Sequence, residues 1–474
     1  MAKALNNLLA HRLPLAGLAA LGTLGGAAVA LAGPGALILC ATLLGCAFIL
    51  RDFRFGVVLL VVLMPLAPSI LFPHAMLGIT GLNPLNLLLA VTFGACLLSR
   101  LDGASPHRFL PLPLLWLFVL PMLAAGALGT QHLGEIAPAL AILSEARSYF
   151  EPLGYLRDFV AKPLSLVLFA LLVAATAARS ARPERLLLAA LISLWMMATL
   201  VIGFVLYSGV GLERLASDES REFLSALGLH ANDLGRLFAV AYALLLFSWG
   251  ACSSPALRLV LLASMAVAVV AMMLTFSRGA FVAFLLINLL YVLWRRNAGA
   301  FAFLALLALA GLLLLPDAVY ERASSGFDSG ADAVSAGRIK GLWLPLLPET
   351  LRSPIYGNGL GSILWSDAMR RSANVTVPPV THPHNAYLQA LLDMGVVGLA
   401  LLCGYFVHVW RRLRALAADP ALSAQLRGFF LGASAALAAV LVSDLTDSSL
   451  LPRPEHVYLW LAIGMMYGLH GQRA

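Results

Sequence analysis

The sequence has few charged residues. Aspartate, glutamate, lysine and arginine make up 11% of the 474 residues, whereas hydrophobic residues make up 61%. A soluble protein carries charge on about a quarter of its residues, so this shortage excludes an ordinary soluble enzyme. The formal net charge of +8 does not indicate nucleic-acid binding, because the basic residues stand between apolar runs, where they set orientation in a membrane.

Cysteine and nucleotide-binding motifs are also scarce. The five cysteines all lie within apolar runs, with no CxxC pair and no cysteine–histidine spacing that suits zinc. The sequence has no GxxxxGK[ST] motif. These absences argue against structural disulfides, a structural zinc site and ATP binding.

Apolar runs long enough to cross a bilayer as helices recur along the whole chain. They predict an all-α polytopic membrane protein, with one transmembrane domain over residues 1–474. The first run passes through Gly33-Pro34-Gly35 into the second, which indicates a hairpin of two spans and not a cleavable signal peptide. We expect about 14 spans, or about 12 if two weak N-terminal segments are re-entrant, near residues 13–32, 35–50, 55–72, 83–99, 110–129, 162–178, 186–209, 236–251, 258–275, 279–294, 299–315, 386–409, 427–443 and 456–470.

The distribution of arginine predicts the orientation of these spans. Arginines gather on alternate loops, which places those loops and both termini in the cytoplasm. The opposite face then holds the long polar segments, and such segments are often functional. The longest, residues 316–385, is expected to contain short helices. The others lie near 130–160, 211–235 and 444–455.

The long segment leads into THPHNAYLQALLDMGVVGL, residues 381–399. If a helix begins near Asn385, then Asn385, Gln389 and Asp393 share one face at i, i+4 and i+8. Gly395 and Gly398 follow and would allow close approach to another helix. Because lipid would leave such a polar stripe unsatisfied, it must face protein or a water-filled cavity.

His384 would point into that cavity from the membrane surface. A lone histidine at an interface is more often a hydrogen-bonded structural residue, but here it accompanies the polar stripe and several cations. A neutral imidazole accepts protons near neutral pH. We therefore predict His384 as a catalytic base, with His382 as the second candidate, and Asn385 or Tyr387 as residues that orient substrate.

Arginines on the outer face run against the positive-inside trend. Arg278 lies in the short turn TFSRGAF, and Arg338 lies in SAGRIKGLWLPLLPETL, which could form an amphipathic helix that includes Trp343. The guanidinium fork suits phosphate oxygens. The alternative is that such side chains snorkel, or pair with nearby acids. Further candidates for substrate binding are Arg147, Arg157, Lys162, Trp343 and Gln389.

A glycine-rich run, SPIYGNGLGS, occupies residues 353–362. A turn-rich connector is the favoured interpretation. In the functional alternative, Gly357 and Gly359 let the backbone approach a diphosphate or a sugar.

The order His384-Asn385, nine residues, Gly395, two residues, Gly398, after a long outer-face loop, resembles the O-antigen ligase and polymerase superfamily of bacterial inner membranes. The resemblance covers about residues 230–465. It includes Arg278, Arg338 with Trp343, and the glycine run.

Within that superfamily the chain resembles the ligases best, which implies a GT-C-like fold. It implies transfer of O-antigen glycan from undecaprenyl diphosphate to a sugar hydroxyl of lipid A–core, on the periplasmic face, in lipopolysaccharide biosynthesis. By the same resemblance His384 is the catalytic histidine, Arg278 and Arg338 contact the diphosphate, and no metal or other cofactor takes part. The expected partners are the two lipid substrates and membrane lipids, without nucleic acid.

Two alternatives remain open. One is an O-antigen polymerase or a protein O-oligosaccharyltransferase, which differ in acceptor. The other is a transporter of lipid-linked glycans, which should carry ionisable residues near the bilayer midplane. The transporter is less favoured, because the candidate charges cluster at one face.

Overall fold

The computed structural model describes residues 35–471 apart from 71, 74, 77–78, 82, 102–108, 144–145, 212–222, 315–316, 325–329, 372–378 and 448, together with 22–23, 26–27 and 30. Most of the predicted span at 13–32 lies outside the described residues. The chain forms two compact units, Met1–Ser105 and Pro106–Ala474.

The elements described in the N-terminal unit are three apolar helices, one short 3-10 helix and a small hairpin. Asp52 starts the second helix, because its carboxylate accepts a hydrogen bond of 3.0 Å from the backbone N–H of Arg54. The hairpin pairs Ala75 with Thr80 and holds the two strands described in the chain. The elements are α2 (Gly35–Arg51), α3 (Phe53–Leu63), η1 (Met64–Leu66), β1 (Ala75–Met76), β2 (Ile79–Thr80) and α4 (Pro84–Leu101).

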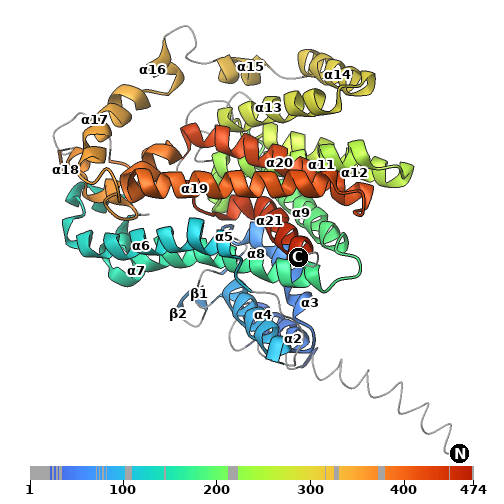
Figure 1. Ribbon diagram of the computed structural model, residues 1–474, viewed down its shortest axis with the longest axis horizontal. Helices are drawn as coiled ribbons and strands as arrows, with labels where there is room; N and C mark the ends of the chain where they lie inside the picture. The colour runs from blue at the N-terminus through green and yellow to red at the C-terminus, as the bar shows by residue number, and fades with distance from the viewer. Residues whose placement is uncertain are drawn as a thin grey trace, which may run out of the picture. The chain divides into compact units, whose positions relative to one another are not determined.

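The secondary-structure elements described in the C-terminal unit are all helices (Figure 1). Its long helices are α6 (Leu120–Gly129), α8 (Lys162–Ala178), α9 (Arg185–Ser208), α11 (Ala231–Ala251), α12 (Pro255–Met273), α13 (Arg278–Arg295), α14 (Ala298–Leu314), α19 (Ala386–Ala418), α20 (Ala424–Ser443) and α21 (Val457–Gly471). Its short elements are α5 (Leu112–Leu114), η2 (Leu115–Val119), η3 (Thr130–Glu135), η4 (Pro138–Ile142), η5 (Arg147–Phe150), α7 (Pro152–Leu156), η6 (Arg157–Ala161), η8 (Leu224–Leu227), α15 (Asp317–Ser324), α16 (Ala331–Val334), η10 (Ile339–Trp343), α17 (Leu344–Leu346), η11 (Leu347–Leu351), η12 (Ser362–Trp365), α18 (Asp367–Arg371), η14 (Asp444–Thr446) and η15 (Pro454–His456).

Helix α11 forms the centre of this unit, and most of it is buried. Helix α20 packs closely against it. A Cβ added at Gly428 would lie 2.6 Å from the carbonyl oxygen of Phe247, and one at Gly432 would lie 2.6 Å from that of Ala243. Small residues four apart therefore let the two backbones meet, as is typical of packed transmembrane helices.

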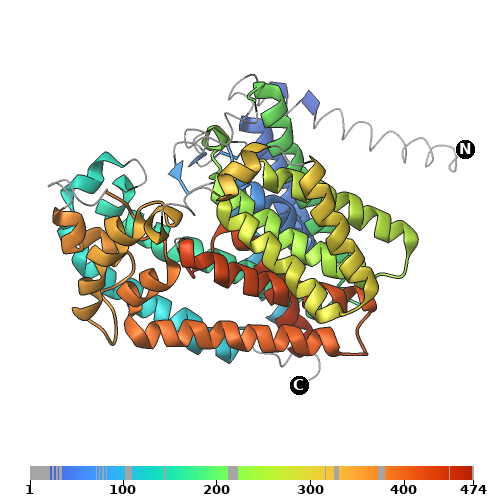
Figure 2. The same cartoon turned by 90° about the horizontal axis from the view of Figure 1, so that it is seen from above.

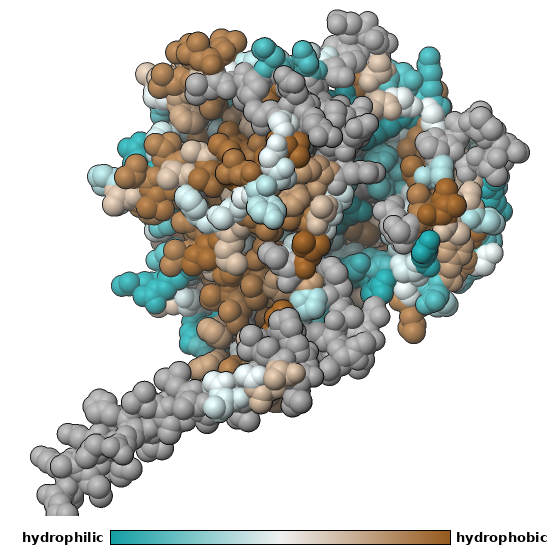
Figure 3. Space-filling view, turned by 180° about the vertical axis from the view of Figure 1, so that it is seen from behind, coloured by the Kyte–Doolittle hydropathy of each residue, from teal (hydrophilic) through white to brown (hydrophobic). Residues whose placement is uncertain are grey.

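The prediction of an all-α polytopic membrane protein is confirmed. Among the described residues, eight helices are long and apolar enough to cross a membrane. Large apolar side chains are exposed on them, among them Leu206 at 75% and Leu285 at 67%, and Figure 3 shows an extensive hydrophobic surface of this kind. The spans are Leu112–Glu135, Pro152–Ala178, Arg185–Ser208, Ala231–Ala251, Pro255–Met273, Arg278–Arg295, Ala386–Ala418 and Ala424–Thr446, with shorter apolar helices at Ile38–Arg51, Phe53–Leu66, Pro84–Ser99 and Ala298–Leu313.

The predicted long segment 316–385 does contain short helices; α15 lies beside α13, and the short helices from α17 to α18 gather at one end of the C-terminal unit (Figure 1, Figure 2). There they meet the segment that follows α6. The backbone N–H of Ala137 donates to the carbonyl of Leu364 across 2.8 Å, and Arg370 forms an ion pair of 2.7 Å with Glu135. Residues 339–351 are helical as predicted, although Pro345 and Pro348 coincide with changes from π to α to 3-10 geometry.

Candidate active site

The two histidines lie in a tight turn at the start of α19. His384 has a φ of 52°, in the left-handed region that a residue other than glycine rarely adopts. Its imidazole meets that of His382 edge to face, with 4.2 Å between ring centroids. A strained residue of this kind motivates a functional hypothesis, and the turn presents both rings together.

Helix α19 begins where the sequence predicted, because Asn385 caps it. The side-chain oxygen of Asn385 accepts hydrogen bonds from the backbone N–H groups of Tyr387 and Leu388, at 3.1 and 3.0 Å. This side chain therefore has a structural role that the sequence interpretation, which gave it to substrate, did not predict.

The C-terminal end of α20 is where the candidate residues meet. The guanidinium of Arg338 donates to the carbonyl of Thr446 across 3.0 Å. The hydroxyl of Tyr387 donates to the carbonyl of Leu441 across 2.6 Å. Arg338 and Tyr387, which lie far apart in the sequence, thus both contact backbone carbonyls at this end of α20.

Arg278 reaches the same place from α13. The hydroxyl of Ser443 donates to the carbonyl of Gly279, the residue after Arg278, at 3.4 Å. Because Ser443 stands three residues before Thr446, Arg278 and Arg338 both lie beside the end of α20. The fold brings together three of the residues that the sequence singled out: Arg278, Arg338 and Tyr387.

Trp343 joins the helical segment 339–351 to the histidine turn. Its indole Nε1 donates a hydrogen bond of 2.7 Å to the carbonyl oxygen of Pro383, between the two histidines. This contact places the segment beside the histidine turn.

His382 lies in a positively charged environment. Burial lowers the pKa of its imidazole well below the usual value, and His384, Arg453, Arg338 and His230 lower it further. His382 is therefore neutral at neutral pH. The sequence interpretation missed Arg453, which follows a proline in the last outer loop and has no local pattern to mark it.

The polar stripe on α19 faces protein. Gln389 donates to Asp393 across 2.6 Å, and the other carboxylate oxygen of Asp393 accepts from the N–H and the hydroxyl of Ser362, at 2.9 and 2.7 Å. Both stripe residues are buried. Gln389 was predicted as a substrate contact; its amide instead helps to hold the glycine-rich loop.

That loop inserts into a break in α19. Gly395 has φ 65° and ψ −169°, a conformation open essentially to glycine alone. A Cβ added there would lie 2.4 Å from the carbonyl of Ile355. The predicted close approach at Gly395 therefore exists, but its partner is the loop and not a second helix.

Gly357 and Gly359 also allow the loop to pack closely against neighbouring backbone. A Cβ at Gly357 would meet the backbone of Asp393 at 2.3 Å, and one at Gly359 would meet the backbone of Gly129 at 2.4 Å. These distances support the connector interpretation, in which both glycines approach protein backbone and not substrate.

Residues 263–403 match the family model described as O-antigen ligase. These residues are similar to the O-antigen ligase family, and we refer to them as the O-antigen ligase segment. No curated protein matches the chain significantly. The O-antigen ligase segment includes Arg278, Arg338, Trp343 and the histidine turn, whereas the end of α20 and Arg453 lie beyond it. Members of the O-antigen ligase and polymerase family act on lipid-linked glycans.

Among the described residues, no group of three or more His, Cys, Asp or Glu is arranged to hold a metal ion.

Three predicted cations precede the O-antigen ligase segment. Arg157 and Lys162 both pair with the carboxylate of Asp158, at 2.8 and 2.6 Å, and Ser148 donates to it as well. Arg147 is exposed. The described contacts do not connect these cations to the histidine turn, so their role in substrate binding stays a prediction.

A buried ionic network flanks the site. Arg236, with 7% of its side chain exposed, pairs with Asp447 and with Glu455, the latter at 3.4 Å. Its Nη1 also lies 3.4 Å from Nε2 of His456. The sequence does not reveal this network, because Arg236 lies on α11 and its partners follow more than 200 residues later. The network holds the segment before α21, and with it Arg453, beside the site.

Proposed function

We propose that this protein is an O-antigen ligase. It transfers O-antigen glycan from undecaprenyl diphosphate to a sugar hydroxyl of lipid A–core, with inversion of the anomeric centre. The observation that supports this proposal best is that Arg278, Arg338 and the histidine turn lie together around the end of α20. The two arginines and the turn also belong to the O-antigen ligase segment. The reaction takes place on the periplasmic face of the bacterial inner membrane.

The arginines act on the donor. When the bond between the anomeric carbon and the diphosphate oxygen breaks, its electron pair stays with the diphosphate, where negative charge develops. Fixed cations stabilise that charge without reorganising. Arg278 and Arg338 present planar forks suited to phosphate oxygens. Arg453 adds positive charge on the same side, as its effect on the pKa of His382 indicates.

His384 acts on the acceptor. Its imidazole takes the proton of the acceptor hydroxyl as that oxygen bonds to the anomeric carbon from the side opposite the diphosphate. His382 is neutral, so it does not oppose the charge that His384 gains. The new glycosidic bond replaces the broken one, and the proton leaves with the diphosphate or to solvent.

In vitro transfer tests the proposal. Purified protein is mixed with undecaprenyl-diphosphate glycan and lipid A–core in the presence of EDTA. We expect glycan on lipid A–core with wild type and none with His384→Ala. His408→Ala, on the distal half of the same helix, is the matched control and should transfer normally.

The same assay separates the alternatives. Longer glycan on the lipid carrier, without transfer to lipid A–core, would assign the protein as a polymerase. Glycan on a protein hydroxyl would assign it as a protein O-oligosaccharyltransferase. Wild-type transfer by His384→Ala would remove the histidine from the mechanism.

A further inference from the structure

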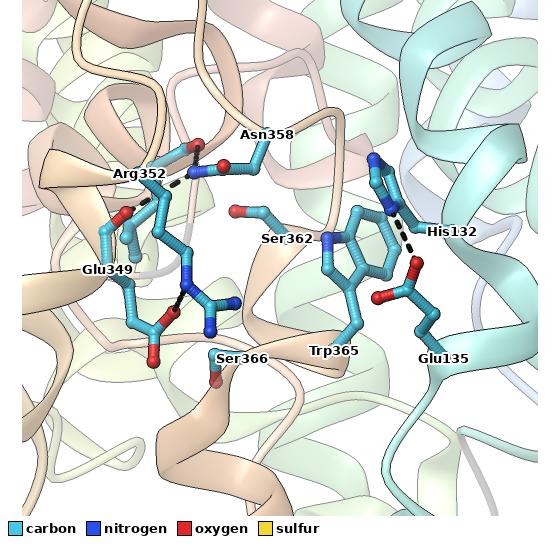
Figure 4. Close-up of a pocket in the computed structure, with 9 residues that line it drawn as sticks. His132, Glu135, Glu349, Arg352, Asn358, Ser362, Trp365 and Ser366 are labelled. Atoms are coloured by element: carbon cyan, nitrogen blue, oxygen red, sulfur yellow. Dashed lines mark hydrogen bonds and ion pairs between the residues drawn. The ribbon is translucent and has the colours of Figure 1, made fainter.

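A second polar cavity lies apart from the histidine turn. Its volume is about 150 Å³, and it opens between the segment after α6 and the segment 349–366 (Figure 4). It is lined by His132, Glu135, Glu349, Arg352, Asn358, Ser362, Trp365, Ser366 and Leu392. Neither the sequence analysis nor the mechanism above uses the cavity.

Trp365 is the residue that marks this cavity as a binding site. Only 3% of it is exposed, and within the described part of the chain its indole Nε1 has no hydrogen-bond partner. In Figure 4 this nitrogen points toward the space between Ser362 and Arg352. A buried donor without a partner costs free energy, and a ligand that accepts a hydrogen bond there would recover it.

An imidazole stacks on this indole. The ring of His132 lies 5.4 Å from that of Trp365, at an interplanar angle of 22°. His132 is held in turn by Glu135, whose carboxylate lies 3.1 Å from its Nδ1. The cavity therefore has a rigid aromatic wall on one side.

The charged side chains at the cavity wall are paired. Glu135 pairs with Arg370 at 2.7 Å, and Glu349 pairs with Arg352 at 3.2 Å. Arg352 also pairs with Asp367. Because Glu349 and Asp367 share Arg352, the three carboxylates outnumber the two arginines, and the wall offers no spare positive charge for a diphosphate. It offers hydrogen-bond donors and acceptors side by side, which is what the hydroxyls of a sugar require.

The size of the cavity limits what can enter. An engineered apolar cavity of about 150 Å³ binds benzene, and a sugar ring with its hydroxyls is larger than benzene. Drug-sized ligands need roughly 300 Å³ or more. The cavity therefore has room for at most one sugar ring, which would fill it and reach its open side, and the rest of a repeating unit must lie outside.

The cavity also adjoins the proposed active site. Leu392 lies on α19 eight residues after His384, which is roughly 12 Å along a helix axis. Ser362 lines the cavity and binds Asp393 of the same helix. A glycan of a few sugars could therefore reach from the histidine turn to the cavity.

We infer that this cavity is a saccharide subsite that binds one neutral sugar ring of a glycan substrate, with Trp365 Nε1 as hydrogen-bond donor and His132 in its wall. This inference rests on the proposed function, which supplies the glycan. The ring belongs either to the donor glycan or to the core acceptor, since both present the same chemistry.

Binding of lipid-free oligosaccharides tests the inference. O-antigen repeat oligosaccharide and core oligosaccharide are titrated separately into detergent-solubilised protein, with saturation-transfer NMR and calorimetry as readouts. We expect one of them to bind wild type, and that one identifies the source of the ring. Trp365→Phe keeps the ring and removes the donor, so it should weaken binding about five- to tenfold.

His384→Ala is the control that separates this inference from the proposed function. It should abolish transfer and leave oligosaccharide binding at the wild-type level. If neither oligosaccharide binds wild type, or if Trp365→Phe and His132→Ala bind as wild type does, the subsite is wrong and the ligase proposal is unaffected. If Trp365→Phe does not fold, His132→Ala is measured in its place. The side chain of His132 is 32% exposed, so its truncation should not prevent folding.

Discussion

Trp343 donates its indole hydrogen to the carbonyl oxygen of Pro383 across 2.7 Å, and so ties the segment 339–351 to the turn between His382 and His384. The backbone that the tryptophan holds is the same backbone that forces His384 into a left-handed conformation. The orientation of the proposed base therefore depends on a residue more than 40 positions before it.

Replacement of Trp343 by phenylalanine removes this hydrogen bond and keeps an aromatic ring in its place. A hydrogen bond of this type contributes about 0.5–1.5 kcal/mol, so we expect kcat/KM for glycan transfer to fall about two- to tenfold. Transfer kinetics with purified protein provide the measurement. Trp410→Phe, on the distal half of α19, is the control; equal rates for the two variants would show that the Trp343 contact has no part in catalysis.

Replacement of Arg278 or Arg338 by lysine keeps the positive charge and removes the planar fork. If the forks bind diphosphate, each substitution should reduce transfer by roughly tenfold or more. Arg258→Lys, in the first turn of α12, should transfer at the wild-type rate. Wild-type activity in Arg278→Lys would exclude its role as a fork for diphosphate.

Replacement of Gly395 by alanine should prevent stable folding. The backbone conformation alone costs an alanine about 1–3 kcal/mol, and its Cβ would lie 2.4 Å from the carbonyl of Ile355. Gly404→Ala, further along the same helix, has no atom within 4 Å of the added Cβ and should leave stability unchanged. Thermal unfolding in detergent compares the two, and similar midpoints would contradict the described break in α19.

Acid should destabilise the protein partly through His456. Burial, Arg236 and Arg453 lower the pKa of this imidazole well below the ordinary value of 6.5. The unfolded chain therefore takes up a proton below pH 6.5 that the folded chain does not, and stability falls as pH drops from 6.5 toward the folded pKa.

The measurement is the unfolding midpoint at pH 7.5 and at pH 5. His456→Gln should lose less stability than wild type over this interval, because the buried group no longer titrates. An unchanged difference in His456→Gln would show that this residue does not contribute to acid sensitivity.

The fold class and the start of the catalytic helix could be predicted because their signals are local. Apolar runs give spans directly, and Asn385 has the side chain that an N-cap requires. The pairing of Arg157 and Lys162 with Asp158 is also local, at one and four residues' distance, and weighs against their assignment to substrate.

The rest of the site depends on contacts between distant segments. Arg453 and the partners of Arg236 have no periodicity or motif that would indicate them. In the sequence, Trp365 cannot be distinguished from other apolar residues. The fold buries it and leaves its indole nitrogen without a hydrogen-bond partner among the described residues. Close approach at Gly395 was correctly predicted, but the sequence does not show which backbone segment contacts it.

The break in α19 also has a mechanical consequence. The amides of Asn358 and Gly359 donate to the carbonyls of residues 392 and 393, and the amides of Val396 and Val397 donate to the carbonyls of residues 354 and 355. These four hydrogen bonds connect the loop to the helix, so the loop cannot move without moving the first turns of α19. The start of α19 is thereby tied to the glycine-rich loop, whereas the histidine turn before it is held by the hydrogen bond from Trp343.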